Sequence, residues 1–84
     1  MDIETSINRG KEAQRVLAEP VLVEAFRALE TAYTEEWKQS AFADTGKRES
    51  AFLMLTALGD LQRQIQAFVT DGQISQGKLQ RHKL

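Results

Sequence analysis

The stretch Ala51–Phe68, AFLMLTALGDLQRQIQAF, decides the fold, because its apolar residues recur at helical spacing. They step by three and four residues along one face: Ala51, Met54, Leu58, Leu61, Ile65 and Phe68. Such a seam is typical of a helix that packs against another helix. We predict a helix over about residues 47–70, capped at its start by Asp44 or Thr45 and stopped by Gly72.

The first half of this helix carries apolar residues on several sides. An all-round apolar half-helix in a small protein needs cover on more than one side. We therefore predict an interface with a second copy of the chain or with another protein. Its candidate residues are Phe52, Leu53, Leu55, Leu58, Leu61 and Ile65.

Two further helices are predicted upstream, over about residues 2–18 and 20–39, with Pro20 separating them because proline suits the first turn of a helix. The second has a stripe of large residues: Leu22, Phe26, Leu29, Tyr33 and Trp37. Beside it runs a stripe of small ones: Val21, Ala25, Ala28 and Ala32. The first helix contains Gly10, which costs about 1 kcal/mol relative to alanine. Either the helix frays there, or the missing side chain lets another backbone approach.

These elements predict an all-α fold. Residues 20–39 and 47–70 would form an antiparallel hairpin, with the N-terminal helix packed across it. A chain of 84 residues makes one domain with a marginal core, and the absence of cysteine removes disulfides as a support. We therefore expect a homo-oligomer that completes the bundle. The domain would span residues 1–72, leaving residues 73–84 as a flexible basic tail.

Charge is unevenly distributed along the chain. Up to Asp44 there are five basic and nine acidic residues, a net charge of −4, and from Lys47 on there are six basic and three acidic residues, a net charge of +3. This polarity suits association between the two halves, within one chain or between chains. It is too mild to indicate nucleic acid by itself. Three tail residues remain candidate nucleic-acid contacts: Lys78, Arg81 and Lys83.

The segment Gly46-Lys47-Arg48 resembles the end of a phosphate-binding loop only superficially. A P-loop needs a second glycine five residues upstream and a preceding buried strand, whereas Ala41 stands at that place and the upstream segment is helical. A capped helix start is the better interpretation. Some anion-binding potential remains at these three residues, because helix N-termini favour negative charge.

No arrangement of residues indicates catalysis or metal binding. Glu35 and Glu36 are adjacent on a helix and point about 100° apart, which is typical of a solvated acidic face. The single histidine, His82, lies in the tail with no triad partner nearby. We expect no enzymatic activity, no metal and no cofactor. The acidic N-terminus, MDIETSINRG, shows no secretory signal, and Ala51–Leu55 is far too short to span a membrane. We expect a cytoplasmic protein.

The chain also resembles a group of short helical proteins encoded by tailed bacteriophages and prophages, often near packaging and head genes. The positions that carry the resemblance are Arg9, Gly10, Ala13, Leu17, Pro20, Phe26, Trp37, Asp44, Arg48, Glu49, Leu58 and Gly72. The resemblance covers most of the chain except the tail. It implies a protein acting in the cytoplasm of a bacterial host or within a virion, and it brings no catalytic residue with it.

Three functional hypotheses follow. The first is a non-enzymatic phage accessory protein that acts by helix-mediated contact with a phage or host protein, in virion assembly or structure. The second is an oligomer that sequesters a small ligand or nucleotide and so counters a host defence. The third is nucleic-acid binding through the basic tail.

Overall fold

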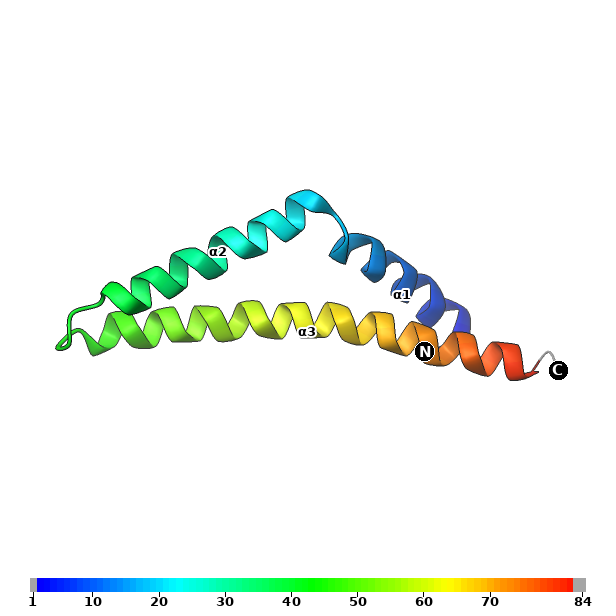
Figure 1. The fold of residues 1–84 in the computed structure, drawn as a ribbon. Helices are drawn as coiled ribbons and strands as arrows, with labels where there is room; N and C mark the ends of the chain where they lie inside the picture. The colour runs from blue at the N-terminus through cyan, green and yellow to red at the C-terminus, as the bar shows by residue number, and fades with distance from the viewer. Residues whose placement is uncertain (1, 83–84) are drawn as a thin grey trace. The chain divides into compact units, whose positions relative to one another are not determined.

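The computed structural model describes residues 2–82 and confirms the all-α class, with three helices and no strand in that range. Helix α1 spans Ile3–Leu17, α2 spans Pro20–Gln39 and α3 spans Thr45–His82 (Figure 1). The chain divides into two compact units. We call residues 20–62 the hairpin unit, and residues 2–19 with 63–82 the glycine unit. Helix α3 contributes its first part to one unit and its last part to the other.

The helices begin where the sequence predicts. Asp2 caps α1, because its side-chain Oδ1 accepts the backbone N–H of Thr5 at 2.7 Å. Pro20 is the first residue of α2. Asp44 caps α3, and its Oδ1 accepts the N–H of Lys47 at 3.1 Å. The first turn of a helix has backbone N–H groups without a partner in the helix. Asp2 and Asp44 accept such an N–H, and Pro20 has no N–H to satisfy.

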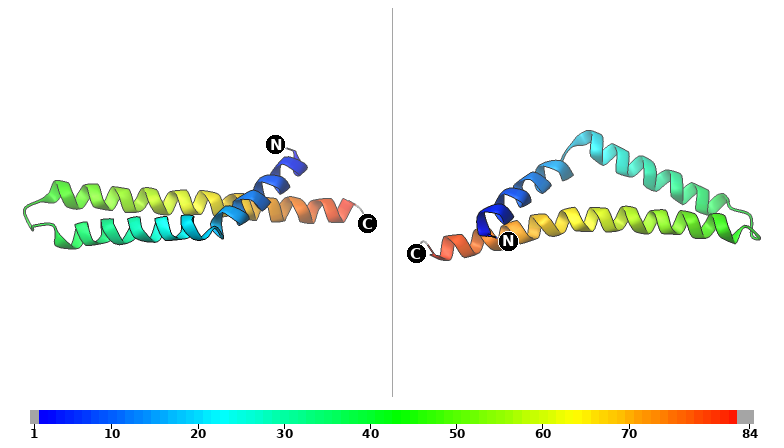
Figure 2. Two further views of the ribbon diagram at one scale, coloured as in Figure 1. Left: turned by 90° about the horizontal axis from the view of Figure 1, so that it is seen from above. Right: turned by 180° about the vertical axis from the view of Figure 1, so that it is seen from behind.

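In the hairpin unit α2 runs antiparallel to the first part of α3; the two helices lie close together near the connecting turn and diverge toward the start of α2, as Figures 1 and 2 show. The connecting turn is built on the carbonyl of Ala41, which accepts the N–H of Asp44 at 2.9 Å and the guanidinium of Arg48 at 2.8 Å. Among the described residues of this unit, Ala51 alone is buried. Leu55 and Leu58, which stand four and seven residues after Ala51, are half-buried. These three residues therefore mark the side of α3 that faces α2.

The predicted seam of α3 is correct in part, because Ala51 is buried and Leu58, Ile65 and Phe68 are half-buried. Met54 and Leu61 were expected on the packed face, but both are exposed. Leu55, which was not in the predicted seam, is half-buried together with Leu58, which was. The sequence allows both seams because the first half of α3 is apolar nearly all round, so the heptad pattern alone does not choose between them.

The glycine unit is held by a close approach of two backbones. A Cβ atom added to Gly10 of α1 would lie 2.9 Å from the Cα of Gly72 and 2.9 Å from the carbonyl oxygen of Phe68, both in α3. One built on Gly72 would lie 3.0 Å from the Cα of Gly10 and 3.1 Å from the carbonyl oxygen of Ser6. Of the two possibilities left open for Gly10, close approach is therefore the correct one.

The prediction that α3 stops at Gly72 and gives way to a flexible tail is wrong for residues 73–82. These residues continue α3, and Gly72 is buried within the helix. The hydroxyl of Ser75 donates to that of Ser6 at 2.9 Å, and Leu79 is half-buried. Packing against α1 thus outweighs the low helix propensity of Gly72. Residues 83 and 84 of the predicted tail lie outside the described residues.

Candidate interaction surface

Large apolar side chains are exposed on one flank of the hairpin unit. On α3, Met54 is 42% and Leu61 is 52% exposed, and Ala57 between them is exposed as well. They step by three and four residues, so they follow one face of the helix. Leu53, at 58% exposure, extends this face away from α2.

Helix α2 continues the same flank. Phe26 and Tyr33 are half-buried and mark its packed side. Leu29 lies between them in sequence. The helical spacing places it at the edge of the packed side, where it is 43% exposed. In an antiparallel pair, the side of α2 that carries Leu29 borders the side of α3 that carries Met54.

We call the combined surface the hairpin face. It consists of three exposed residues from each helix: Ala25, Leu29 and Ala32 of α2, and Met54, Ala57 and Leu61 of α3. Helix α2 presents one large residue between two alanines, helix α3 presents one alanine between two large residues, and none of the six carries a charge. Alternating large and small side chains create the ridges and grooves into which further helices pack.

Other exposed apolar residues of the hairpin unit lie elsewhere. Phe42, in the turn between α2 and α3, is 95% exposed, and the guanidinium of Arg48 lies 5.9 Å from the centre of its ring. Phe52 of α3 and Trp37 of α2 are also exposed. Of the six interface residues predicted from sequence, Phe52, Leu53 and Leu61 are open to solvent. The other three, Leu55, Leu58 and Ile65, are half-buried.

The structure places the candidate anion-binding residues at the start of α3, as the sequence suggested. The carboxylate of Asp44 already accepts the N–H of Lys47. The guanidinium of Arg48 turns back to the carbonyl of Ala41. A carboxylate at this position occupies a helix donor and repels further anions, so the geometry favours the capped helix start over an anion site at Gly46.

The candidate nucleic-acid contacts lie on the last turns of α3. Lys78 and Arg81 are exposed and three residues apart, which places them on the same side of the helix. Lys83 lies outside the described residues. Two exposed cations on one helix are a weak electrostatic footprint by comparison with nucleic-acid-binding domains.

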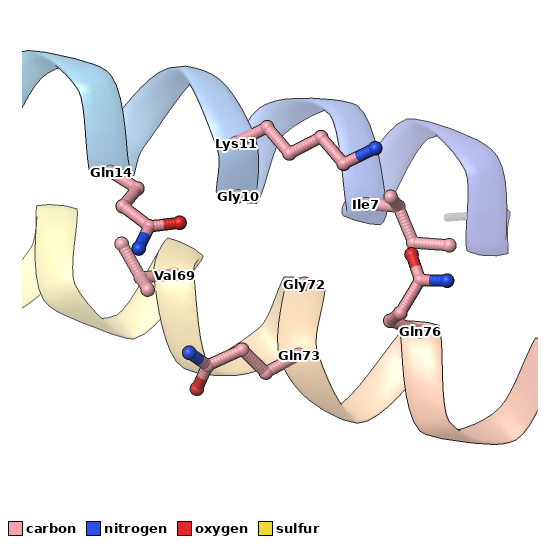
Figure 3. A pocket seen from close by; sticks show the side chains of 8 residues that line it. All are labelled: Ile7, Gly10, Lys11, Gln14, Val69, Gly72, Gln73 and Gln76. Carbon is pink, nitrogen blue, oxygen red and sulfur yellow. The ribbon is translucent and has the colours of Figure 1, made fainter.

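A shallow groove of about 140 Å³ flanks the Gly10–Gly72 contact in the glycine unit. Figure 3 shows its eight lining residues, with the two glycines facing each other and three glutamines at its edges. Beyond the groove, the guanidinium of Arg9 lies 4.4 Å from the centre of the Phe68 ring. The sequence offered a close backbone approach at Gly10 as one possibility, but it revealed neither Gly72 as the partner nor the contact of Arg9 with Phe68. The signal that could have found them is the pair Ser6 and Gly10, small residues four apart on the packed side of α1.

Titratable groups do not form a reaction centre in residues 2–82. Glu35 is exposed and accepts a hydrogen bond from the side chain of Gln39 at 3.3 Å, which suits a solvated face. No group of three potential metal ligands occurs among the described residues. In the same range, no helix has the length and apolar character to cross a bilayer.

Comparison with known proteins gives no relative: no protein-family model, no curated protein and no solved structure matches this chain.

Proposed function

We propose that this chain is a non-enzymatic protein that works by docking its hairpin face on another protein surface. One observation carries the proposal. Leu29, Met54 and Leu61 are each about half exposed on adjoining flanks of two helices, together with three alanines. Scattered exposed apolar residues are normal on a soluble protein, whereas a contiguous apolar surface marks an interaction site.

The exposed side chains of this surface supply part of the free energy that docking requires. Covering the open half of a leucine or methionine side chain contributes roughly 1 kcal/mol, from a full-burial value of about 1.5–3 kcal/mol. Leu29, Met54 and Leu61 together would contribute about 3 kcal/mol. Association costs roughly 4–15 kcal/mol, so a partner must bring apolar surface of its own.

The setting we propose is virion assembly or structure in a tailed bacteriophage, in the cytoplasm of its bacterial host or in the particle. The resemblance of the chain to phage-encoded helical proteins supports this setting. Alternation of small and large residues on the hairpin face suits contact with helices, whether of another copy of the chain or of a capsid or packaging protein.

A photo-crosslinking experiment tests the proposal. A benzophenone amino acid replaces Leu61 on the hairpin face or, as a matched control, Glu24 on the exposed polar side of α2. We expect irradiation of infected cells and purified particles to give covalent protein products from position 61 and none from position 24. Mass spectrometry then identifies each product. Absence of any protein product from position 61, with the chain folded and present, would contradict docking through this face.

A further inference from the structure

We propose that the hairpin face is covered by a second copy of this chain, in a two-fold symmetric dimer in which two hairpins form a four-helix bundle. This inference rests on the proposed function and names the partner. It follows from the core of the hairpin unit, from the charge of the face and from its shape.

The hairpin unit has too little core to stand without a partner. Ala51, a single methyl side chain, is the one buried residue in residues 20–62, and no residue of α2 is buried. Small domains bury a low fraction of their surface and depend on added support, and this chain has no cysteine for disulfides. If the chain needs a partner in order to fold, that partner must be present whenever the chain is synthesised. A second copy of the same chain meets that condition.

The charge of the face permits self-contact. A symmetric interface brings each residue near its own copy or near residues of the same patch, so a charged patch would repel itself. None of the six residues of the hairpin face is charged, and the exposed Glu36, four residues after Ala32 on the same side of α2, lies beyond its end near the turn. Along α3, Asp60 and Arg63 are the only charged residues from Ser50 to Thr70, and their charges cancel. A face without net charge has no electrostatic obstacle to pairing with its own copy.

The shape of the face suits an identical partner. Ala25, Ala32 and Ala57 carry only a methyl group, and they alternate at helical spacing with the large residues Leu29, Met54 and Leu61. A two-fold axis through the face would set the large residues of one copy against the alanines of the other, as ridges pack into grooves between helices. The same small residues would let the helices of the two copies approach closely.

The absence of cysteine makes a direct test possible, because in a single-cysteine variant every disulfide joins two chains. Met54→Cys, Ala57→Cys and Leu61→Cys sample α3 along the face, and Glu24→Cys is the control. A disulfide needs Cβ atoms about 3.8 Å apart, so positions near a two-fold axis cross-link fastest. We expect at least one of the three to form a linked dimer at low oxidant while Glu24→Cys stays monomeric. Equal, slow oxidation at all four positions would overturn the inference.

Light scattering on the full-length chain gives an independent readout. We expect a mass about twice the 9.5 kDa of one chain at micromolar concentration. Ala57→Glu places a charge inside the interface without removing an apolar contact within the hairpin unit, and should return the mass to that of a monomer. Thr31→Glu adds the same charge at an exposed position of α2 outside the face and should leave the dimer intact.

Failure of this inference differs from failure of the proposed function. A wild-type chain that is monomeric by light scattering, with its helical circular dichroism intact, overturns the dimer. Docking would still be supported if position 61 then cross-links to a different protein. If position 61 cross-links to nothing, both are overturned.

Discussion

Two glycines determine how α1 meets α3. Any side chain at Gly10 or Gly72 would meet backbone atoms of the other helix at about 3 Å, and backbone cannot rotate away as a side chain can. In a helix interior, each glycine forgoes up to about 1 kcal/mol relative to alanine. The close packing of the two backbones is what offsets that loss.

Alanine substitutions test this contact against helix propensity. Gly72→Ala improves the helix by up to about 1 kcal/mol but overpacks the contact by roughly 1–3 kcal/mol, so we expect net destabilisation of about 1–2 kcal/mol. Gly77→Ala is the matched control, because a Cβ at Gly77 has no atom within 4 Å. It should stabilise the chain by up to about 1 kcal/mol. Urea unfolding measures both, and equal stabilisation by both substitutions would refute the close contact.

Asp2 provides a pH-dependent contribution to α1. The carboxylate of Asp2 accepts a hydrogen bond from the backbone N–H of Thr5. This hydrogen bond holds the pKa of Asp2 below the ordinary value of 3.8. A lowered pKa in the folded state means that the stabilisation is present above 3.8 and is lost as the pH falls through the folded value.

Substitution of Asp2 isolates this contribution. Asp2→Asn keeps a capping oxygen but removes the titration. We expect the loss of helical circular dichroism on acidification to be smaller in this variant than in the wild-type chain. Identical acid titration curves for the two proteins would show that Asp2 contributes no pH dependence.

At the scale of the elements, α3 shows what a helical sequence pattern can and cannot specify. The helical class and start of α3, and the bounds of α2, follow from spacing, Pro20 and the cap at Asp44. The end of α3 could not be predicted in this way. Glycine is a common stop signal for a helix, but Gly72 lies inside α3, where it allows close contact with Gly10 of α1. Gly10 is distant in sequence, and local patterns do not encode such a contact.

Truncation tests whether the end of α3 is structural. Deleting residues 73–84 removes the Ser75 hydroxyl that bonds Ser6 and the half-buried Leu79. We expect faster amide hydrogen exchange in α1 and a lower urea midpoint. A disordered tail would be removed without either effect, so unchanged exchange in residues 6–13 would contradict the packed helix.

At the scale of the whole molecule, an excess of apolar helical surface was predictable, and its location was not. The all-round apolar pattern of residues 51–58 indicated that one neighbour could not cover α3. The open flank of α3 depends on which of its apolar residues face α2. Leu55 and Leu58 are half-buried on the side that faces α2, and Met54 and Leu61 are therefore left exposed. The hairpin face, with its contributions from α2, therefore emerges only when the two helices are seen together.

The most direct test of the account is amide hydrogen exchange measured over a range of protein concentrations. If the hairpin face is covered by another copy, protection of residues 53–61 should rise with concentration, because mass action favours the covered state. Protection of residues 6–13, held by the Gly10–Gly72 contact within one chain, should change much less. Protection of residues 53–61 that is the same at every concentration would contradict the account.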